Sequence, residues 1–240
     1  MANAHRYIGT AGWTVPRRYA GDFPSDGSHL VRYAQRLNAV EINSSFYRPH
    51  RRQTYVRWAS SVPGDFRFAV KVPKAITHER GLADCDDLVA RFIGEAGGLG
   101  GKLGVLLVQL PPSLVYDAAT ARAFFARLRR SCDAAIVCEP RHASWFTDAV
   151  EDALMDLEVA RVAADPEPVA GAGAPGGWGG LAYYRLHGSP RIYCSDYDAR
   201  ALAALASPKR AFATGAGLVH LRQYGGLRRP WKRAGGKRRH

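Results

Sequence analysis

Apolar runs and segments of helical periodicity alternate along most of the chain. Seven runs rich in Val, Ile, Leu and Phe predict strands at residues 6–13, 40–47, 66–73, 104–112, 134–139, 159–165 and 182–188. Apolar residues spaced three or four apart predict helices at residues 29–37, 53–61, 86–98, 120–130, 150–157 and 198–206. Strands that alternate with helices across short connections are typical of a parallel sheet covered by helices.

Seven predicted strands in 240 residues favour one fold class, an α/β TIM (β/α)8-type barrel. The alternative is a doubly wound open sheet. That fold is not favoured, because no Gly-x-Gly-x-x-Gly turn follows the first strand and no phosphate-binding loop is present. The Gly-, Pro- and Ala-rich segment 166–180 is predicted to be a mobile loop.

Polar residues follow the apolar runs at their carboxyl ends. The fifth run leads directly into Glu139, Arg141 and His142. Parallel α/β proteins place their active sites at this end of the sheet, so the pattern indicates a site. The simpler interpretation is that Glu139 and Arg141 only pair with each other. In the second run, alternation places Glu41 and Asn43 on one side, and a polar stripe inside a sheet is costly unless it lines a wet or ligand-filled site.

The composition, 47% hydrophobic and 23% charged, suits a globular domain with a sizeable core. No apolar run reaches the roughly 20 residues of a membrane span, and the first residues lack a signal peptide's apolar region. The four cysteines are scattered without metal-ligand spacing. We therefore expect a cytoplasmic protein with reduced thiols and no membrane partner.

The net charge of +13 is concentrated in one segment. Residues 207–240 contain ten Lys or Arg and no Asp or Glu, whereas residues 1–206 contain 24 basic and 21 acidic residues. We therefore divide the chain into a barrel domain, 1–206, and an atypical basic tail, 207–240. A basic tail of this kind fits nucleic-acid phosphates, which is one interpretation of it.

Six ordered motifs resemble one known family. They read Ile-Gly-Thr-Ala-Gly-Trp at 8–13, Val-Glu-Ile-Asn-Ser-Ser-Phe-Tyr at 40–47, Phe-Ala-Val-Lys-Val-Pro at 68–73, Val-Gln-Leu-Pro-Pro at 108–112, Glu-Pro-Arg-His-Ala-Ser-Trp at 139–145 and Tyr-Arg-Leu-His-Gly at 184–188. The chain is similar to the domain-of-unknown-function 72 (YecE-like) family from about residue 6 to about residue 206. The resemblance implies a TIM barrel and no agreed activity. The family's likeness to isomerase and endonuclease barrels is an analogy of fold alone.

The resemblance also exposes a departure in the tail. Family members close the barrel with a strand resembling Trp-Cys-Ile-Phe-Asp-Asn-Thr and an Ala-rich helix. Read one base out of frame from Leu218, permitted codons spell that strand followed by Ala-Ala-Phe-Ala-Ala. We therefore expect the eighth strand and helix to be missing or altered, and we interpret residues 207–240 as a frameshift product rather than native family sequence.

The carboxyl ends of the strands bring candidate site residues to one barrel mouth. The candidates for catalysis are Glu41, Glu139, Asp165 and His187, and those for substrate binding are Trp13, Asn43, Tyr47, Lys71, Gln109, Arg141, His142 and Arg185. We treat the remaining histidines of the first 80 residues, His78 among them, as surface residues. Cys138 lies within a strand, where a core position is expected.

The basic residues of the mouth favour an anionic ligand, because Arg and Lys bind phosphate and carboxylate groups. We expect an enzyme that acts on a small phosphorylated or sugar-like anion by acid/base chemistry, isomerase-like or phosphoester hydrolase-like in kind. The carboxylates with His187 are an alternative set of ligands for a divalent metal. A nucleic-acid-binding or nucleic-acid-processing barrel is the alternative function. No sequence feature indicates the oligomeric state.

Overall fold

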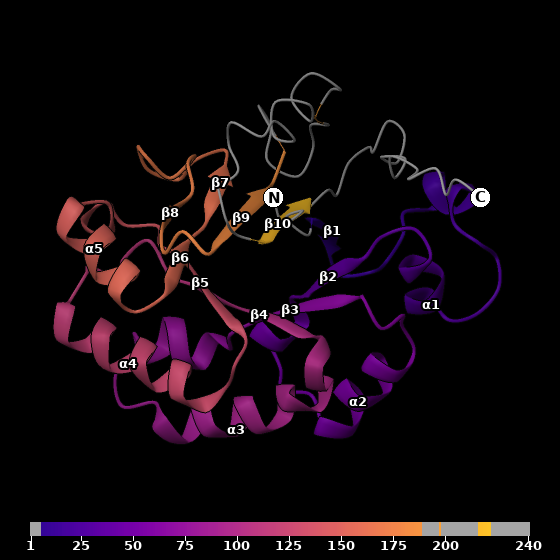
Figure 1. Cartoon of the computed structure of the whole chain (residues 1–240), viewed down its shortest axis with the longest axis horizontal. Helices are drawn as coiled ribbons and strands as arrows, with labels where there is room; N and C mark the ends of the chain where they lie inside the picture. Colours follow the sequence, from indigo (N-terminus) through magenta and orange to yellow (C-terminus); the bar gives the residue numbers. More distant parts are fainter. Residues whose placement is uncertain (1–5, 189–196, 198–215, 222–240) are drawn as a thin grey trace, which may run out of the picture.

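The chain folds into one curled sheet with helices along its outer side (Figure 1). The computed structural model describes residues 6–188, Tyr197 and residues 216–221, the last as backbone only. Within these residues no helix is long and apolar enough to cross a membrane.

The strands of the sheet are β1 (Arg6–Ala11), β2 (Ala39–Ile42), β3 (Arg67–Lys71), β4 (Leu103–Gln109), β5 (Ala135–Glu139), β6 (Val159–Arg161), β7 (Ala163–Asp165), β8 (Gly176–Gly177), β9 (Leu181–Leu186) and β10 (Ala216–Leu221). The α-helices are α1 (His29–Ala34), α2 (Arg52–Ser60), α3 (Asp86–Ala96), α4 (Ala118–Ser131) and α5 (Asp148–Asp156). Short helical turns complete the fold: η1 (Arg17–Asp22), η2 (Ser44–Phe46), η4 (Gly97–Lys102) and η5 (Ala143–Trp145) are 3₁₀ and η3 (Ala75–Glu79) is a π-helix.

The strand order is β7-β9-β10-β1-β2-β3-β4-β5-β6-β8, and every pair is parallel except β6 with β8. The predicted α/β class and parallel sheet are therefore confirmed. The predicted sixth strand is divided, because Val162 separates β6 from β7. β6 pairs with β5, whereas β7 pairs with β9. The single segment 159–165 therefore contributes one strand to each side of the curled sheet.

A strand is present at the place where we expected the eighth strand to be missing or altered. β10 lies between β9 and β1 and pairs in parallel with both (Figure 1). The strand is therefore not missing, and its altered sequence stays a prediction. The predicted helix at 198–206 and most of the basic tail lie outside the described residues.

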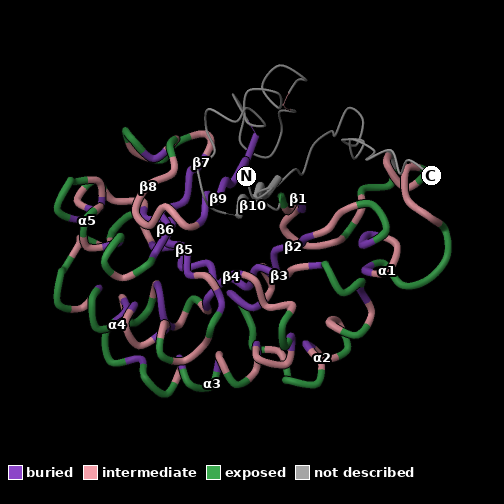
Figure 2. The backbone as a smooth tube through the Cα atoms, in the orientation of Figure 1, coloured by how far each residue is buried: buried purple, intermediate pink, exposed green. Residues whose placement is uncertain are grey.

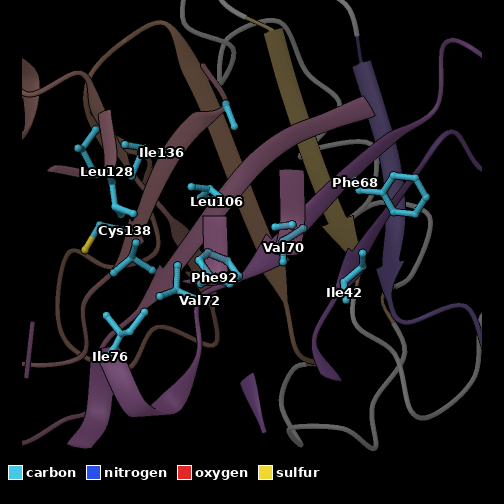
Figure 3. Close-up of a cluster of buried hydrophobic side chains, with 14 of the residues drawn as sticks. Ile42, Phe68, Val70, Val72, Ile76, Phe92, Leu106, Leu128, Ile136 and Cys138 are labelled. Carbon is cyan, nitrogen blue, oxygen red and sulfur yellow. The ribbon is translucent and has the colours of Figure 1, made fainter. Parts of the chain in front are cut away.

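Alternation along the strands divides the core into two layers. One set of side chains faces the helices, where Val70, Leu106 and Ile136 of the strands pack near Phe92 of α3 and Leu128 of α4 (Figure 3). The other set faces the inside of the curl and forms a second buried cluster that includes Ala39, Ala69, Val105, Leu107, Val137 and Tyr183. Buried residues follow the strands, and exposed residues lie mainly on the helices and loops (Figure 2).

Residue size on the inner face allows the strands to approach one another closely. A Cβ atom at Gly9 of β1 would lie 2.0 Å from the carbonyl oxygen of Ala39 on β2. The close approach of β1 and β2 therefore requires glycine at this position, because any side chain would push the two strands apart.

Two predicted elements differ from the structure near the sheet's carboxyl edge. The second strand ends at Ile42 rather than at residue 47, because Ser45 turns inward and its one hydroxyl proton is shared between the carbonyls of Ile42 (2.9 Å) and Lys71 (2.6 Å). The polar loop predicted after the third strand is instead η3, in which the Arg80 amide donates to the Ala75 carbonyl at 3.1 Å. π-Turns of this kind often occur at functional sites.

The segment predicted to be a mobile loop is held by an ion pair. Arg161 donates to the Glu151 carboxylate and to the carbonyls of Gly171 (3.1 Å) and Ala174 (3.2 Å). Glu151 in turn accepts a hydrogen bond from the Gly177 amide at 2.5 Å. The Gly-rich composition therefore serves close approach to α5 and β6 rather than freedom of movement.

Candidate functional site

The inner face of the sheet changes from apolar to polar at the carboxyl ends of its strands. Residues two apart share a face, so the inward residues Ala39, Ala69, Leu107, Val137 and Tyr183 are each followed on the same face by a polar residue. These polar residues are Glu41, Lys71, Gln109, Glu139 and Arg185, and all are buried. The sequence pattern thus places chemistry at the carboxyl edge, as predicted.

Arg185 lies at the centre of this polar layer. Its guanidinium donates to both carboxylate oxygens of Glu41, at 3.1 Å from Nε and 3.0 Å from Nη2. Its Nη1 donates to Glu139 Oε2. All three side chains are at most 1% exposed. The bidentate geometry and second carboxylate provide the compensation that a buried charge needs.

Glu139 links the centre to the surface. Its Oε1 accepts hydrogen bonds from Gln109 Nε2 at 2.8 Å and from Arg141 Nη2 at 2.9 Å. Glu139 and Arg141 do pair, but the simpler interpretation that they pair only with each other is wrong, because Arg185 and Gln109 also bond Glu139. We call Glu41, Gln109, Glu139, Tyr183 and Arg185 the buried ion cluster.

Electrostatics keep the buried ion cluster charged. Burial alone would raise the pKa of Glu139, but Arg185, Arg141, His187 and the Gln109 amide hold that pKa well below its usual range. Burial and then Glu41 raise the pKa of Tyr183 well above its ordinary value, so the phenol stays protonated and donates to Glu41 Oε2 at 3.3 Å. A carboxylate held this firmly ionised is a weak proton acceptor.

A second group of residues adjoins the buried ion cluster through Arg141, which bonds Glu139. We call Lys71, Lys74, His78 and Arg141 the cationic rim. The Lys71 ammonium lies 3.8 Å from the centroid of the Phe46 ring. The His78 ring meets the same Phe46 ring edge-on, with centroids 4.9 Å apart. Burial, then Lys71, Lys74 and Arg141, lower the pKa of His78, while Glu79 raises it.

Asp165 and His187 are joined through the backbone rather than through their side chains. The His187 amide donates to the Asp165 carbonyl at 2.7 Å, and the Tyr197 hydroxyl donates to the same oxygen at 3.2 Å. His187 is buried and is one of the groups that lower the pKa of Glu139, so it lies near the buried ion cluster.

Four other predicted site residues make local contacts. His142 caps η5, where its Nδ1 accepts from the Ser144 amide at 3.2 Å. Trp13 packs edge-on against Trp58 at 5.0 Å. The Oδ1 atom of Asn43 is buried and has no hydrogen-bond partner among the described residues. Tyr47 is 74% exposed and contacts the edge of Phe46.

The alternative of a metal site finds no matching arrangement. Within residues 6–188 and the other described positions, no group of three or more His, Cys, Asp or Glu side chains is arranged to hold a metal ion. Glu41 and Glu139 direct their oxygens at Arg185 instead. Cys138 is buried in the core, as predicted, and burial raises the pKa of its thiol well above the ordinary value.

Sequence reasoning missed two members of the site. Tyr183 could have been found from its spacing, since it shares the inner face with Arg185. His78 could not, because the π-turn of η3 places it and no helical or strand period predicts that turn. The histidine that we treated as a surface residue is half-buried and faces the site's cations.

The fold and the site together define an α/β protein whose curled sheet gathers charged residues at the carboxyl ends of its strands. The family model described as "Protein of unknown function DUF72" matches residues 7–221, so the chain belongs to this family. The match reaches the end of β10 and confirms the resemblance seen in the motifs.

Curated relatives and solved structures agree with this assignment. The chain is 34% identical to the UPF0759 protein YecE of Escherichia coli K12 over 105 residues, which are 44% of this chain and 37% of that protein. It is 27% identical to the UPF0759 protein YunF of Bacillus subtilis over 149 residues, covering 59% of this chain and 52% of that one. The matched stretches thus span about a third to a half of those relatives.

Two crystal structures share the fold. A DUF72 family protein from Enterococcus faecalis superposes with a TM-score of 0.73 at 20% identity, over 93% of this chain and 92% of that chain. A DUF72 family protein from Thermotoga maritima gives a TM-score of 0.69 at 21% identity, over 91% and 92%. At this level of identity the likeness concerns the fold alone.

Proposed function

We propose that this protein is an enzyme that binds a small anionic substrate, phosphorylated or sugar-like, at the carboxyl edge of its sheet. The observation that supports this most directly is the cationic rim, in which Lys71 and His78 contact the same Phe46 ring and Arg141 bonds Glu139 at the carboxyl end of β5. Cations gathered from separate elements around a partly desolvated position favour an anion between them.

In this proposal the buried ion cluster and the cationic rim have different roles. The buried ion cluster has both of its carboxylates bonded to Arg185 and holds the floor of the site rigid. The cationic rim supplies the attraction for the ligand. Acid/base catalysis requires a group that gains and loses a proton. In this proposal His78 of the cationic rim has that role, because Glu139 is held firmly ionised.

We further propose that the sheet closes as a TIM-type barrel through the segment 159–165. The pairing of β6 with β5 and of β7 with β9 supports this closure, because one segment then joins the two sides of the curl. A site at the carboxyl ends of the strands matches the position of active sites in such barrels.

The ligand proposal is tested by titrating the protein with sulfate, followed by calorimetry. Lys71→Met should weaken sulfate binding at least about tenfold, since one charge-assisted contact contributes about 1.5–3 kcal/mol. Arg91→Gln removes an exposed cation from α3 and serves as the control, with unchanged affinity expected. Absence of sulfate binding to the unaltered protein, or equal binding by Lys71→Met, would contradict the proposal.

The nucleic-acid alternative stays a prediction. All ten basic residues of the segment 207–240 lie outside the described residues. The domain boundary at 206 and the frameshift interpretation likewise remain proposals, which sequencing the gene from codon 200 in all three frames would test.

A further inference from the structure

The loop after β2 and the helix α2 carry positive charge that the protein does not neutralise. Residues 43–64 contain four arginines and no Asp or Glu. These arginines are Arg48, Arg51, Arg52 and Arg57. All four are exposed, and none makes an ion pair with a described residue. On the helix α3, which packs against α2, the carboxylate of Glu95 is already bonded to Arg91 at 2.9 Å.

Packing holds the loop against the helix, so the four arginines belong to one surface. The His50 ring meets the Trp58 ring of α2 edge-on, with centroids 5.1 Å apart, and its Nε2 lies 2.8 Å from the Ser44 hydroxyl oxygen. His50 lies between Arg48 and Arg51 in the chain, and Trp58 follows Arg57 directly. We call the four arginines the arginine surface.

An exposed aromatic ring adjoins the arginine surface. Tyr47 precedes Arg48 in the chain and is 74% exposed. Its ring meets that of Phe46 at 88° with centroids 4.9 Å apart, and Phe46 itself is buried. An aromatic side chain that is anchored at one side and exposed to this degree leaves a ring face open to a planar ligand.

We propose that single-stranded nucleic acid binds to the arginine surface, with phosphates at the guanidinium groups and a base stacked on Tyr47. Arginine binds phosphate oxygens through two parallel hydrogen bonds, and proteins hold single strands by combining basic side chains with aromatic rings. A duplex keeps its bases stacked on one another, so it offers no base to Tyr47. This inference goes beyond the proposed function and does not depend on it.

An anionic membrane fits the arginine surface less well. Helices that lie on membranes expose large apolar side chains that insert among the lipids. The helix α2 instead exposes Arg52, Gln53, Arg57 and Ser60, and none of its described residues is an exposed large apolar side chain.

The test measures binding of a labelled oligothymidylate of about 12 nucleotides to the full chain by fluorescence anisotropy. One variant combines Arg48→Gln, Arg51→Gln, Arg52→Gln and Arg57→Gln. At about 50 mM salt it should bind at least about tenfold more weakly than the unaltered protein. The slope of log affinity against log salt should fall by about 2–3, because each phosphate contact of a single strand contributes about 0.7.

The matched control removes the same number of exposed arginines from other elements. It combines Arg80→Gln, Arg91→Gln, Arg122→Gln and Arg130→Gln. Its affinity should stay within about threefold of the unaltered protein, because only the net charge changes. Residues 207–240 are the same in both variants, so their charge does not affect the comparison. Thermal denaturation checks that both variants fold.

Tyr47→Ala tests the stacked base separately. This variant should bind oligothymidylate at least about fivefold more weakly, whereas its affinity for inorganic polyphosphate, which has no bases, should not change. Equal losses for the two polymers overturn the stacking. Oligothymidylate binding that survives the loss of the arginine surface, or that falls equally in the control, overturns the proposal. Binding of the full chain to phosphatidylserine vesicles but not to oligothymidylate also overturns it, in favour of a membrane.

Discussion

The buried ion cluster and the cationic rim are both charged, but they differ in how far their charges are shielded from water. In the buried ion cluster, each carboxylate oxygen of Glu41 and Glu139 accepts a hydrogen bond from Arg185, Tyr183, Gln109 or Arg141. In the cationic rim, Lys74 pairs with Glu79 and Arg141 pairs with Glu139, and these cations are partly open to solvent. Removing one partner of a charge pair sealed from water is costly, whereas a pair open to solvent exchanges its partner for a ligand at little cost.

The largest expected effect comes from removing the centre of the buried ion cluster. Arg185→Met leaves Glu41 and Glu139 buried without their shared partner, and we expect a loss of at least about 3 kcal/mol in the free energy of unfolding. Thermal denaturation should show a fall of about 10 °C or more. Arg91→Met, at a side chain that is 64% exposed, is the matched control and should change stability by less than about 0.5 kcal/mol. Equal losses of stability in Arg185→Met and Arg91→Met would contradict the difference between buried and exposed charges.

The next effect concerns acid stability. The pKa of Glu139 is lowered in the folded state, so its contribution is present above the unfolded value of about 4.5 and is lost as the pH falls below it. The free energy of unfolding of the unaltered protein should decline on acidification through this range. Glu139→Gln should be less stable at pH 7 by about 2 kcal/mol and should decline less steeply. Parallel curves for the two proteins would show that Glu139 is not held ionised.

Arg141 is a member of the cationic rim and also bonds Glu139 of the buried ion cluster. Its substitution therefore tests the difference between the two groups. Its side chain is 32% exposed, and solvent weakens its contribution to the fold. Arg141→Gln should change the free energy of unfolding by less than about 1 kcal/mol. Sulfate affinity, measured by calorimetry, should fall about tenfold. The opposite result, a large loss of stability with unchanged affinity, would assign Arg141 to the buried ion cluster alone.

The smallest effect is expected at Tyr47, the exposed ring beside Phe46. Tyr47→Ala should leave both stability and inorganic phosphate binding unchanged. It should weaken binding of phenyl phosphate about threefold to tenfold, since a stacked ring contributes about 0.5–1.5 kcal/mol. Comparing the two ligands by titration isolates the ring. A parallel loss for both ligands would mean that Tyr47 does not contact the organic part.

Sequence periodicity predicted the strands and helices well where one rule governs a long segment. The helices at 53–61 and 86–98 correspond to α2 and α3 within two residues at each end, and the inward position of Glu41 follows from alternation. Arg185 was placed at the mouth for the same reason.

The errors in the predicted strands have local causes that hydrophobic periodicity does not reveal. Ser45 ends β2 through hydrogen bonds to Ile42 and Lys71, a strand far along the chain. The sixth predicted strand is divided at Val162, because the residues before it pair with β5 and the residues after it pair with β9. The partners of Glu139 could not be ranked from the sequence, since Arg185 and Gln109 reach it only in the folded chain.

The pairing of β1 with β10 has a consequence for synthesis of the protein. Residues 6–11 of β1 are synthesised before one of their two strand partners, Ala216–Leu221, which follows β9 in the sequence. The edge of β1 that pairs with β10 therefore stays open while β2 to β9 are translated, and an open strand edge pairs readily with other chains. Contacts this distant in sequence also form slowly. A nascent chain of this protein thus has a long interval in which a chaperone would protect it.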